Sequence, residues 1–328
     1  MATISNLLTI EQVAELSTRI IAEVEKAVIG KHMVLNQMMA AFLSSGGHIL
    51  LEDYPGLAKT LIANSFATAL GLEFSRIQFT PDLLPGDITG GYVFDSNQNQ
   101  FQLRRGPVFA NIVLADEINR ASPKTQSALL EAMQEYQVTL EGESLALPTP
   151  FIVIATQNPI EYEGTFPLPE AQLDRFMVKL SIGYPSPVEE AEILKRRAER
   201  KHDGVDLQAV IDASTFLAMR AAVEEVYVDP DVQRYIVAMV TASRQHRQVA
   251  VGASPRGSLA LLKLARAWAA IQGRDYVVPD DIKEFTQSAL VHRLVLEPSL
   301  WGTPRTENAI INEVVASISV PVIQAAHE

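Results

Sequence analysis

Runs of apolar residues divide the first half of the chain into five predicted β-strands. The segments 112–117 and 151–158 are nearly continuous apolar runs, which is typical of strands buried on both faces of a sheet. The other three predicted strands are residues 48–52, 73–80 (which alternates) and 177–182. Because helical patterns lie between several of these strands, we expect a parallel sheet with helices on both faces.

Helical spacing of apolar residues is found before, between and after these strands. It predicts helices over residues 8–28, from there through Leu43, from Lys59 to Leu70, and over residues 123–136. After Pro185 only helices are predicted, at about residues 188–201, 230–246, 255–272, 279–291 and 307–319.

The change of pattern near Pro185 predicts two domains. We expect an α/β domain over residues 1–185, which includes the N-terminal helices, and an all-helical domain over residues 186–328. The segment Tyr184-Pro185-Ser186-Pro187 is interpreted as a proline-marked hinge between them.

Two short hairpins are predicted in addition to the core elements of the α/β domain. Apolar triplets flank a polar segment within about residues 86–105, and again within about residues 137–148. Extra hairpins on a scaffold usually carry contacts. Inert surface decoration is the alternative.

Composition narrows the function classes. The chain of 328 residues is 48% hydrophobic and 20% charged, which is typical of a globular protein. It has no cysteine, which excludes disulfides and thiolate metal sites, and its six histidines lack metal-ligand spacing. The formal charge of −12 disfavours a nucleic-acid partner. No basic start or bilayer-length apolar run is present, so we expect a cytoplasmic protein without a membrane segment.

A phosphate-binding loop is predicted where the first strand ends. An apolar strand is followed by a tight turn, and then by Lys59 and Thr60 at the start of a helix. Backbone N–H groups in such a turn bind phosphate oxygens. Lys59 can reach the β- and γ-phosphates of a nucleotide, and Thr60 can hold Mg²⁺. The candidate nucleotide-binding residues here are Tyr54, Pro55, Gly56, Leu57, Ala58, Lys59, Thr60 and Leu61.

Two positions of this loop differ from the strict pattern, which has glycine in place of Asp53 and Ala58. Alanine is small enough for a phosphate to approach closely. Aspartate tolerates positive φ better than most residues, so the turn can form if the Asp53 carboxylate points away from the phosphates. The alternative is an ordinary strand-turn-helix with a surface lysine.

Two adjacent carboxylates end the third predicted strand. Asp116 is a candidate Mg²⁺ ligand together with Thr60, and Glu117 is a candidate for polarising the attacking water. Because the phosphate loop and this pair occur in the expected order, the residues favour a Mg²⁺-dependent ATPase.

Asn158 and Arg256 are candidates for completing the site. Asn158 ends the fourth predicted strand, at the carboxyl edge where parallel sheets bind ligands. It could orient water or contact the γ-phosphate. Arg256 lies in the first turn of a predicted helix, where the helix dipole disfavours a cation. A γ-phosphate would remove this penalty if the helical domain closed over the site. The alternatives are a strand-closing asparagine and an exposed arginine.

Arg175 is a candidate arginine finger, supplied to the nucleotide of a neighbouring subunit. Its alternative partner is Asp174 or another nearby carboxylate. Arg120 is a second candidate for this contact between subunits. Val28 and Ile29 are candidates for the adenine pocket, although a plain turn between two helices explains them nearly as well.

With these motifs in place, the chain resembles the MoxR-family AAA+ ATPases. The match covers nearly the whole chain from Val28 on, and the block between Gly106 and Phe176 is highly specific. The motifs that carry it are YPGLAKT (54–60), LPGDITG (84–90), DEINRA (116–121), ATQNP (155–159), QLDRF (172–176) and SPRG (254–257).

The resemblance implies a Rossmann-like αβα domain and an all-helical lid that assemble into a ring, typically a hexamer. It implies that the hairpins correspond to the helix-two insert and the pre-sensor hairpin. Members resemble chaperones that mature or activate protein complexes, often beside a partner with a von Willebrand factor A domain. The implied roles are Walker A for Lys59 and Thr60, Walker B for Asp116 and Glu117, sensor one for Asn158, arginine finger for Arg175 and sensor two for Arg256.

The leading hypothesis is ATP hydrolysis coupled to the remodelling of a protein partner. A nucleotide-gated scaffold is the second hypothesis, because Asp53 could make hydrolysis too slow to matter. A DNA motor is disfavoured by the acidic charge, and a small-molecule kinase by the absence of an evident acceptor pocket in the sequence. The sequence does not identify the client.

Overall fold

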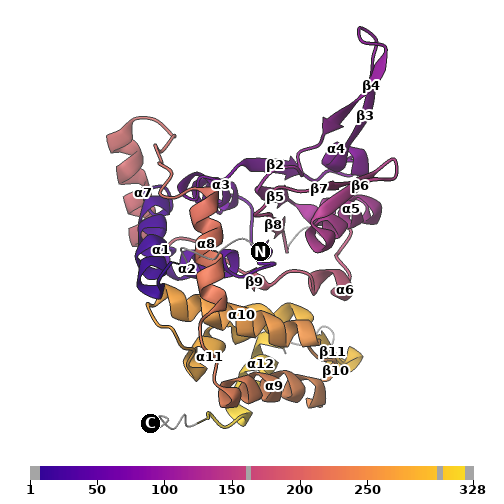
Figure 1. The fold of residues 1–328 in the computed structure, drawn as a ribbon. Helices are drawn as coiled ribbons and strands as arrows, with labels where there is room; N and C mark the ends of the chain where they lie inside the picture. Colours follow the sequence, from indigo (N-terminus) through magenta and orange to yellow (C-terminus); the bar gives the residue numbers. More distant parts are fainter. Residues whose placement is uncertain (1–7, 160–163, 301–305, 322–328) are drawn as a thin grey trace.

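The computed structural model describes residues 8–159, 164–300 and 306–321. At its centre lies a five-stranded parallel sheet in the order β2-β5-β8-β1-β9 (Figure 1). Each strand falls within the run of residues that predicted it, so the expected parallel sheet is confirmed. The strands are β1 (Ile49–Glu52), β2 (Phe74–Gln78), β5 (Ile112–Asp116), β8 (Ile152–Gln157) and β9 (Val178–Leu180).

The two faces of this sheet pack into different hydrophobic clusters. Leu50 and Val113 are fully buried on the face that contacts α5 (Pro123–Glu135). Their neighbours Ile49 and Leu114 are fully buried on the opposite face. This second face is covered by α1 (Ile10–Val24), α2 (His32–Leu43) and α3 (Lys59–Ala69). Since successive side chains of a strand point to opposite faces, burial on both sides explains the nearly continuous apolar runs.

Helix starts in this domain follow local capping chemistry. Thr9 and Gln12 form a reciprocal capping box at the start of α1. Ser122 accepts from the backbone N–H of Thr125, and Pro123 occupies the first turn of α5. Glu117 and the 3₁₀ turn η1 (Ile118–Arg120) connect β5 to that helix.

Both expected hairpins are present. The first, β3 (Gly90–Asp95) with β4 (Gln100–Arg105), projects far from the body of the molecule (Figure 1). The second consists of β6 (Gln137–Leu140) and β7 (Glu143–Ala146). The Tyr92 hydroxyl donates to Glu143 Oε2 at 2.7 Å and links the two hairpins. A short helix, α4 (Pro85–Thr89), precedes the first hairpin and was not predicted.

Among the described residues of the second half, the regular structure is helical, as expected, apart from a pair of short strands and an isolated bridge between Tyr227 and Tyr276. Val249–Val251 (β10) pairs antiparallel with Val295–Leu296 (β11), so the expectation of helices alone is wrong there. Strands of two or three residues are too short to give a periodic signal. The helices are α7 (Pro187–Arg200), α8 (Ala213–Glu224), α9 (Pro230–Gln245), α10 (Pro255–Ile271), α11 (Pro279–Leu290) and α12 (Glu307–Ser317).

Helix α8 was also missed, although its sequence carries a signal. Asp212 caps its first turn by accepting from the Thr215 N–H at 2.8 Å. Phe216, Met219 and Val223 are buried along one face at helical spacing. The remaining short elements are α6 (Glu170–Leu173), η2 (Val291–Arg293) and η3 (Pro298–Leu300).

One hydrophobic cluster joins the sheet to the helical half. It continues from Ile49 through Phe42 of α2 to Leu261 of α10 and Phe285 of α11, all of them buried. The helical half therefore packs directly on the α/β layers. The domain boundary at residues 185/186 stays a prediction.

Candidate functional site

The loop after β1 has the backbone of a phosphate cradle. Gly56 has φ 82° and Ala58 has φ 55°, both in the left-handed region, which turns the chain sharply into α3. For alanine this conformation costs about 1–2 kcal/mol. The N-cap residue of α3, Ala58, makes no side-chain cap hydrogen bond. The backbone N–H groups of the first turn of α3 are thus left without an N-cap acceptor.

Lys59 is already directed into this loop. Its amine donates to the carbonyl oxygens of Asp53 at 2.7 Å and Tyr54 at 2.9 Å. Burial lowers the pKa of Lys59, and the nearby carboxylates of Asp53, Asp116 and Glu117 oppose this shift. The amine therefore stands among acceptors that phosphate oxygens could replace.

A cavity of about 480 Å³ lies at the carboxyl ends of the strands. It joins the phosphate loop to the carboxylate pair and to Asn158, which the sequence had placed together. Its lining residues are Pro55, Gly56, Leu57, Ala58, Lys59, Thr60, Leu61, Arg76, Gln78, Asp116, Glu117, Thr156, Gln157 and Asn158.

Asp116 is fixed by two neighbouring strands. The Thr156 hydroxyl on β8 donates to Asp116 Oδ1 at 2.7 Å. Arg76 on β2 donates to Oδ2 through Nε at 3.1 Å and Nη2 at 2.6 Å. The same Thr156 oxygen accepts from the backbone N–H of Glu117 at 2.8 Å. Thr156 therefore orients both carboxylate residues.

Glu117 lies on a strained turn directly after β5, with φ 57°. Its Oε2 accepts from Gln78 Nε2 at 2.8 Å and from Arg120 Nη1 at 2.9 Å. Arg120, a candidate for a contact between subunits, thus binds a carboxylate of its own chain in this structure.

Arg76, Gln78 and Thr156 were missed by the sequence interpretation. They are polar residues at or near the carboxyl ends of strands, and two of them alternate on β2. Gln78 lies opposite Asp116 in the parallel register of β2 and β5. Polar residues at the end of a core strand can indicate a binding site. Assigning these three residues to the site of Asp116 and Glu117 also requires the order of the strands in the sheet.

Asp53 points away from the cavity, as the sequence interpretation required. Its buried carboxylate accepts from the Ser181 hydroxyl at 2.8 Å, and from the backbone N–H groups of Ile182 and Gly183. These donors belong to the segment that follows β9. Asp53 therefore ties the start of the phosphate loop to the segment after β9.

We expect Asp53→Asn to lower the free energy of unfolding by about 1–3 kcal/mol, because an amide NH₂ would face backbone donors that need an acceptor. Denaturant unfolding measures this change. The matched control is Asp206→Asn at an exposed aspartate, for which a change within about 0.5 kcal/mol is expected. Equal stability of the two variants would show that the hydrogen bonds of Asp53 to the segment after β9 do not stabilise the fold.

The residues at the cavity fit Mg²⁺. The Thr60 hydroxyl and the Asp116 carboxylate are hard oxygen ligands of the kind this ion prefers. In the described parts of the chain, no group of three or more His, Cys, Asp or Glu side chains could hold a metal ion. Further ligands would thus be phosphate oxygens and water, as is usual for Mg²⁺.

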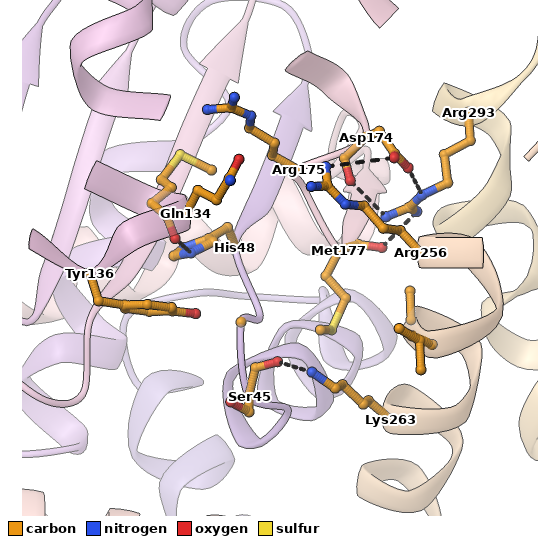
Figure 2. A pocket seen from close by; sticks show the side chains of 14 residues that line it. Ser45, His48, Gln134, Tyr136, Asp174, Arg175, Met177, Arg256, Lys263 and Arg293 are labelled. Carbon is orange, nitrogen blue, oxygen red and sulfur yellow. Dashed lines mark hydrogen bonds and ion pairs between the residues drawn. The ribbon is translucent and has the colours of Figure 1, made fainter. Parts of the chain in front are cut away.

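Arg175 and Arg256 line a second cavity, of about 220 Å³, between the α/β layers and α10 (Figure 2). This differs from the expectation that Arg256 serves the phosphates of its own chain. The reason is that α10 packs on α1 and α2, and its first turn faces Asp174. Both arginines thus lie away from Lys59, and the Arg175 guanidinium donates to the Leu130 carbonyl at 2.6 Å.

The second cavity is lined by a histidine, His48, as well as by basic side chains. His48 is buried, and burial lowers its pKa to about 4. Its Nδ1 accepts from the Val153 N–H at 3.0 Å, and its Nε2 lies 3.2 Å from the Met133 carbonyl. Lys263 of α10 donates to the Ser45 carbonyl at 2.9 Å across the cavity (Figure 2).

The expected adenine-side residues are not among those that line the first cavity. Val28 and Ile29 form the turn between α1 and α2, and Val28 is buried in the hydrophobic cluster. The Lys31 amine donates to the Tyr184 carbonyl at 2.9 Å, and the Tyr184 ring stacks on Tyr54 with centroids 5.8 Å apart. An adenine site here stays a prediction.

Two family models match the chain. The model described as "ATPase family associated with various cellular activities (AAA)" matches residues 48–178. The model described as "AAA lid domain" matches residues 241–314.

Similar proteins cover nearly the whole chain. "Uncharacterized protein YeaC" of Bacillus subtilis is 46% identical over 96% of this chain and 98% of its own length. "Chaperone MoxR1" of Mycobacterium tuberculosis is 42% identical over 94% of this chain and 83% of its own length. A crystal structure from Cytophaga hutchinsonii, of a protein proposed to be an ATPase, has a TM-score of 0.89 and 38% identity, covering 95% of this chain and 97% of that one.

None of the helices among the described residues combines the length and apolar character that crossing a membrane requires.

Proposed function

The chain belongs to the MoxR family of AAA+ ATPases, and from this premise we propose that it is a Mg²⁺-dependent ATPase that works as a homo-oligomeric ring, in which turnover remodels a protein partner. The observation that carries the proposal is the division of charged groups between two cavities. Lys59, Asp116 and Glu117 line one cavity, and Arg175 and Arg256 line the other.

Within the first cavity, each residue has a distinct task. Backbone N–H groups of residues 56–60 and the Lys59 amine bind the phosphates, in place of the carbonyl contacts that Lys59 makes in this structure. Glu117 accepts a proton from the attacking water, and Asn158 orients that water. The Mg²⁺ ion, held by Thr60 and Asp116, would neutralise charge on the phosphate oxygens.

The second cavity supports a contribution from a neighbouring subunit. Arg175 and Arg256 line a cavity that is separate from the first cavity of their own chain. In a head-to-tail ring, we propose that the second cavity of one subunit faces the nucleotide of the next. Both guanidinium groups would then stabilise charge on the transferring phosphoryl group.

A protein client is supported by the name of one relative, "Chaperone MoxR1". The projecting hairpin offers a surface for such a contact, because Phe94 and Phe101 are exposed on it and pair with ring centroids 5.4 Å apart. We propose that the client or an adaptor with a von Willebrand factor A domain binds here. A cytoplasmic location and the size of the ring stay predictions.

A nucleotide-gated scaffold is favoured by one observation. Gln78 and Arg120 both donate to Glu117 Oε2, and these contacts compete with water for the carboxylate. Asp53 no longer supports this alternative, because its carboxylate faces the segment after β9. The two functions differ in the ATPase rate of the assembled particle.

We expect ATP and Mg²⁺ to convert the protein to a closed ring and to make the ATPase rate per subunit rise with protein concentration. Each site is complete only beside a neighbour, so dilution separates Lys59 from the arginines that serve it. Mass photometry gives the particle mass and phosphate release gives the rate.

Repeating both measurements with a candidate partner tests the choice of client. A concentration-independent rate from a monomer would refute the ring. Full assembly with negligible phosphate release would favour the scaffold.

A further inference from the structure

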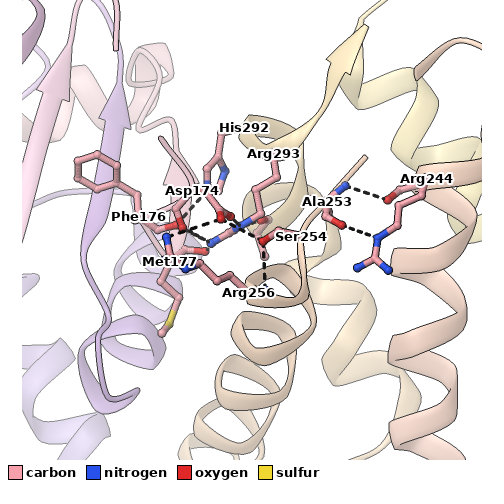
Figure 3. Close-up of polar contacts among 11 residues, drawn as sticks. Asp174, Phe176, Met177, Arg244, Ala253, Ser254, Arg256, His292 and Arg293 are labelled. Atoms are coloured by element: carbon pink, nitrogen blue, oxygen red, sulfur yellow. Dashed lines mark hydrogen bonds and ion pairs between the residues drawn. The ribbon is translucent and has the colours of Figure 1, made fainter. Parts of the chain in front are cut away.

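Asp174 lies at the centre of a joint between the α/β layers and the helical half (Figure 3). Its carboxylate accepts from Arg293 Nε at 2.8 Å and from the Ser254 hydroxyl at 3.0 Å. Arg256 Nη1 lies 3.8 Å from the same oxygen that Ser254 contacts. Asp174 therefore touches three side chains of the helical half, and it precedes Arg175 in the chain.

Arg293 is a permanent partner of this carboxylate. Its side chain is only 3% exposed. It also donates to the carbonyls of Phe176 at 2.7 Å and Met177 at 3.2 Å, and to that of Ala289. A buried cation with this many acceptors cannot leave without stranding its charge. Arg293 thus fixes Asp174 and the segment after it to η2.

Arg256 is an exchangeable partner of the same carboxylate. Its side chain is 52% exposed, and its distance to Asp174 exceeds that of a good hydrogen bond. Exposed ion pairs of this length are weak. Because Arg293 continues to neutralise Asp174, Arg256 can leave the carboxylate without exposing a buried uncompensated charge.

We propose that Asp174 is a positioning residue, which holds the Arg256 guanidinium in the second cavity until a phosphate of the neighbouring subunit's nucleotide takes over that contact. The inference rests on the proposed function, in which Arg256 acts on that nucleotide. The phosphate carries more negative charge than a carboxylate that is already paired, so it wins the guanidinium when the subunits meet. Arg293 keeps the joint closed throughout.

A double-mutant cycle tests this inference on the full-length protein in its assembled form. In Arg256→Gln, kcat for ATP should fall about tenfold or more, and in Asp174→Asn about three- to tenfold, with KM changed less than about twofold. The double variant should match Arg256→Gln within about twofold, since Asp174 acts through Arg256.

Three further variants keep the test decisive. Asp206→Asn removes one charge from an exposed aspartate that lines neither cavity, so kcat should stay within about twofold of wild type. Asp174→Glu keeps a partner for buried Arg293. If circular dichroism shows Asp174→Asn unfolded, the cycle is completed with Asp174→Glu, whose displaced carboxylate should lower kcat only when Arg256 is present.

The outcomes distinguish a failure of the proposed function from a failure of the positioning role of Asp174. If Arg256→Gln turns over ATP at the wild-type rate in assembled particles, the role of Arg256 in the proposed function is wrong and Asp174 has nothing to position. Suppose instead that Arg256→Gln is impaired while the Asp174 substitution lowers kcat by the same factor in the Arg256→Gln background as in the wild type. In that case, only the positioning role of Asp174 is refuted.

Discussion

Glu117→Gln abolishes ATP turnover but not ATP binding: we expect kcat to fall by about 10²–10⁴-fold, since this substitution removes the group that accepts a proton from water. Glutamine has the shape of glutamate, and its amide oxygen can still accept a hydrogen bond from Gln78 or Arg120. The hydrogen bonds of Lys59 in the phosphate loop go to the carbonyls of Asp53 and Tyr54 and do not involve this carboxylate. Phosphate release under steady-state conditions measures turnover, and a fluorescent nucleotide measures binding.

The matched control is Glu199→Gln, because Glu199 is exposed on α7 and lies outside the residues that line the first cavity. Its kcat and its ATP affinity should equal those of the wild type. Normal turnover in Glu117→Gln would remove Glu117 from the mechanism. Loss of ATP binding would instead assign it to the phosphate contacts.

Arg175→Ala should also lose turnover, by about 10³-fold or more, and recover it when mixed with Lys59→Ala subunits. A Lys59→Ala subunit cannot bind phosphates but still presents Arg175. An Arg175→Ala subunit binds ATP but presents no arginine at that position. Because Arg175 lines a different cavity from Lys59 in its own chain, the two defects are complementary only across a subunit boundary.

In an equal and random mixture, half of the subunits bind ATP and half of those meet an intact donor. The mixture should therefore show about a quarter of wild-type activity per subunit. Each variant alone, at the same total concentration, is the control. If subunit exchange is verified by mass and activity never returns, Arg175 is not supplied to a neighbour.

The parts of the fold that sequence predicted well are those in which one physical constraint dominates. Strands β1, β5 and β8 at the centre of the sheet are buried on both faces, so their apolar runs had to be nearly continuous. The phosphate loop and the pair Asp116-Glu117 were recognised because their chemistry depends on spacing within one segment. The first cavity accordingly contains the Lys59, Thr60 and carboxylate residues that were expected.

The parts that sequence could not predict depend on how distant segments pack. Arg76 contacts Asp116 only because β2 and β5 are neighbours in the sheet. The position of Arg256 depends on the packing of α10 against α1 and α2, which no local pattern specifies. The β10–β11 pair joins strands more than 40 residues apart in sequence, and each strand is too short to be recognised alone.

Asp53 illustrates a third case, in which the residue was recognised as unusual and its reason was missing. An aspartate in place of glycine suggested that ATP hydrolysis could be slow. The structure gives the carboxylate a different task, as the acceptor for three donors from residues 181–183. The departure from the motif is thus explained by the segment that follows β9.

The buried cluster that extends from Ile49 through Phe42 to Leu261 has a mechanical consequence. Close-packed interiors resist deformation, so the sheet and α10 must rotate together as one stiff unit. Little strain can be absorbed inside a subunit built in this way. If the subunits assemble as proposed, force produced by nucleotide turnover would then be delivered at the contacts between subunits.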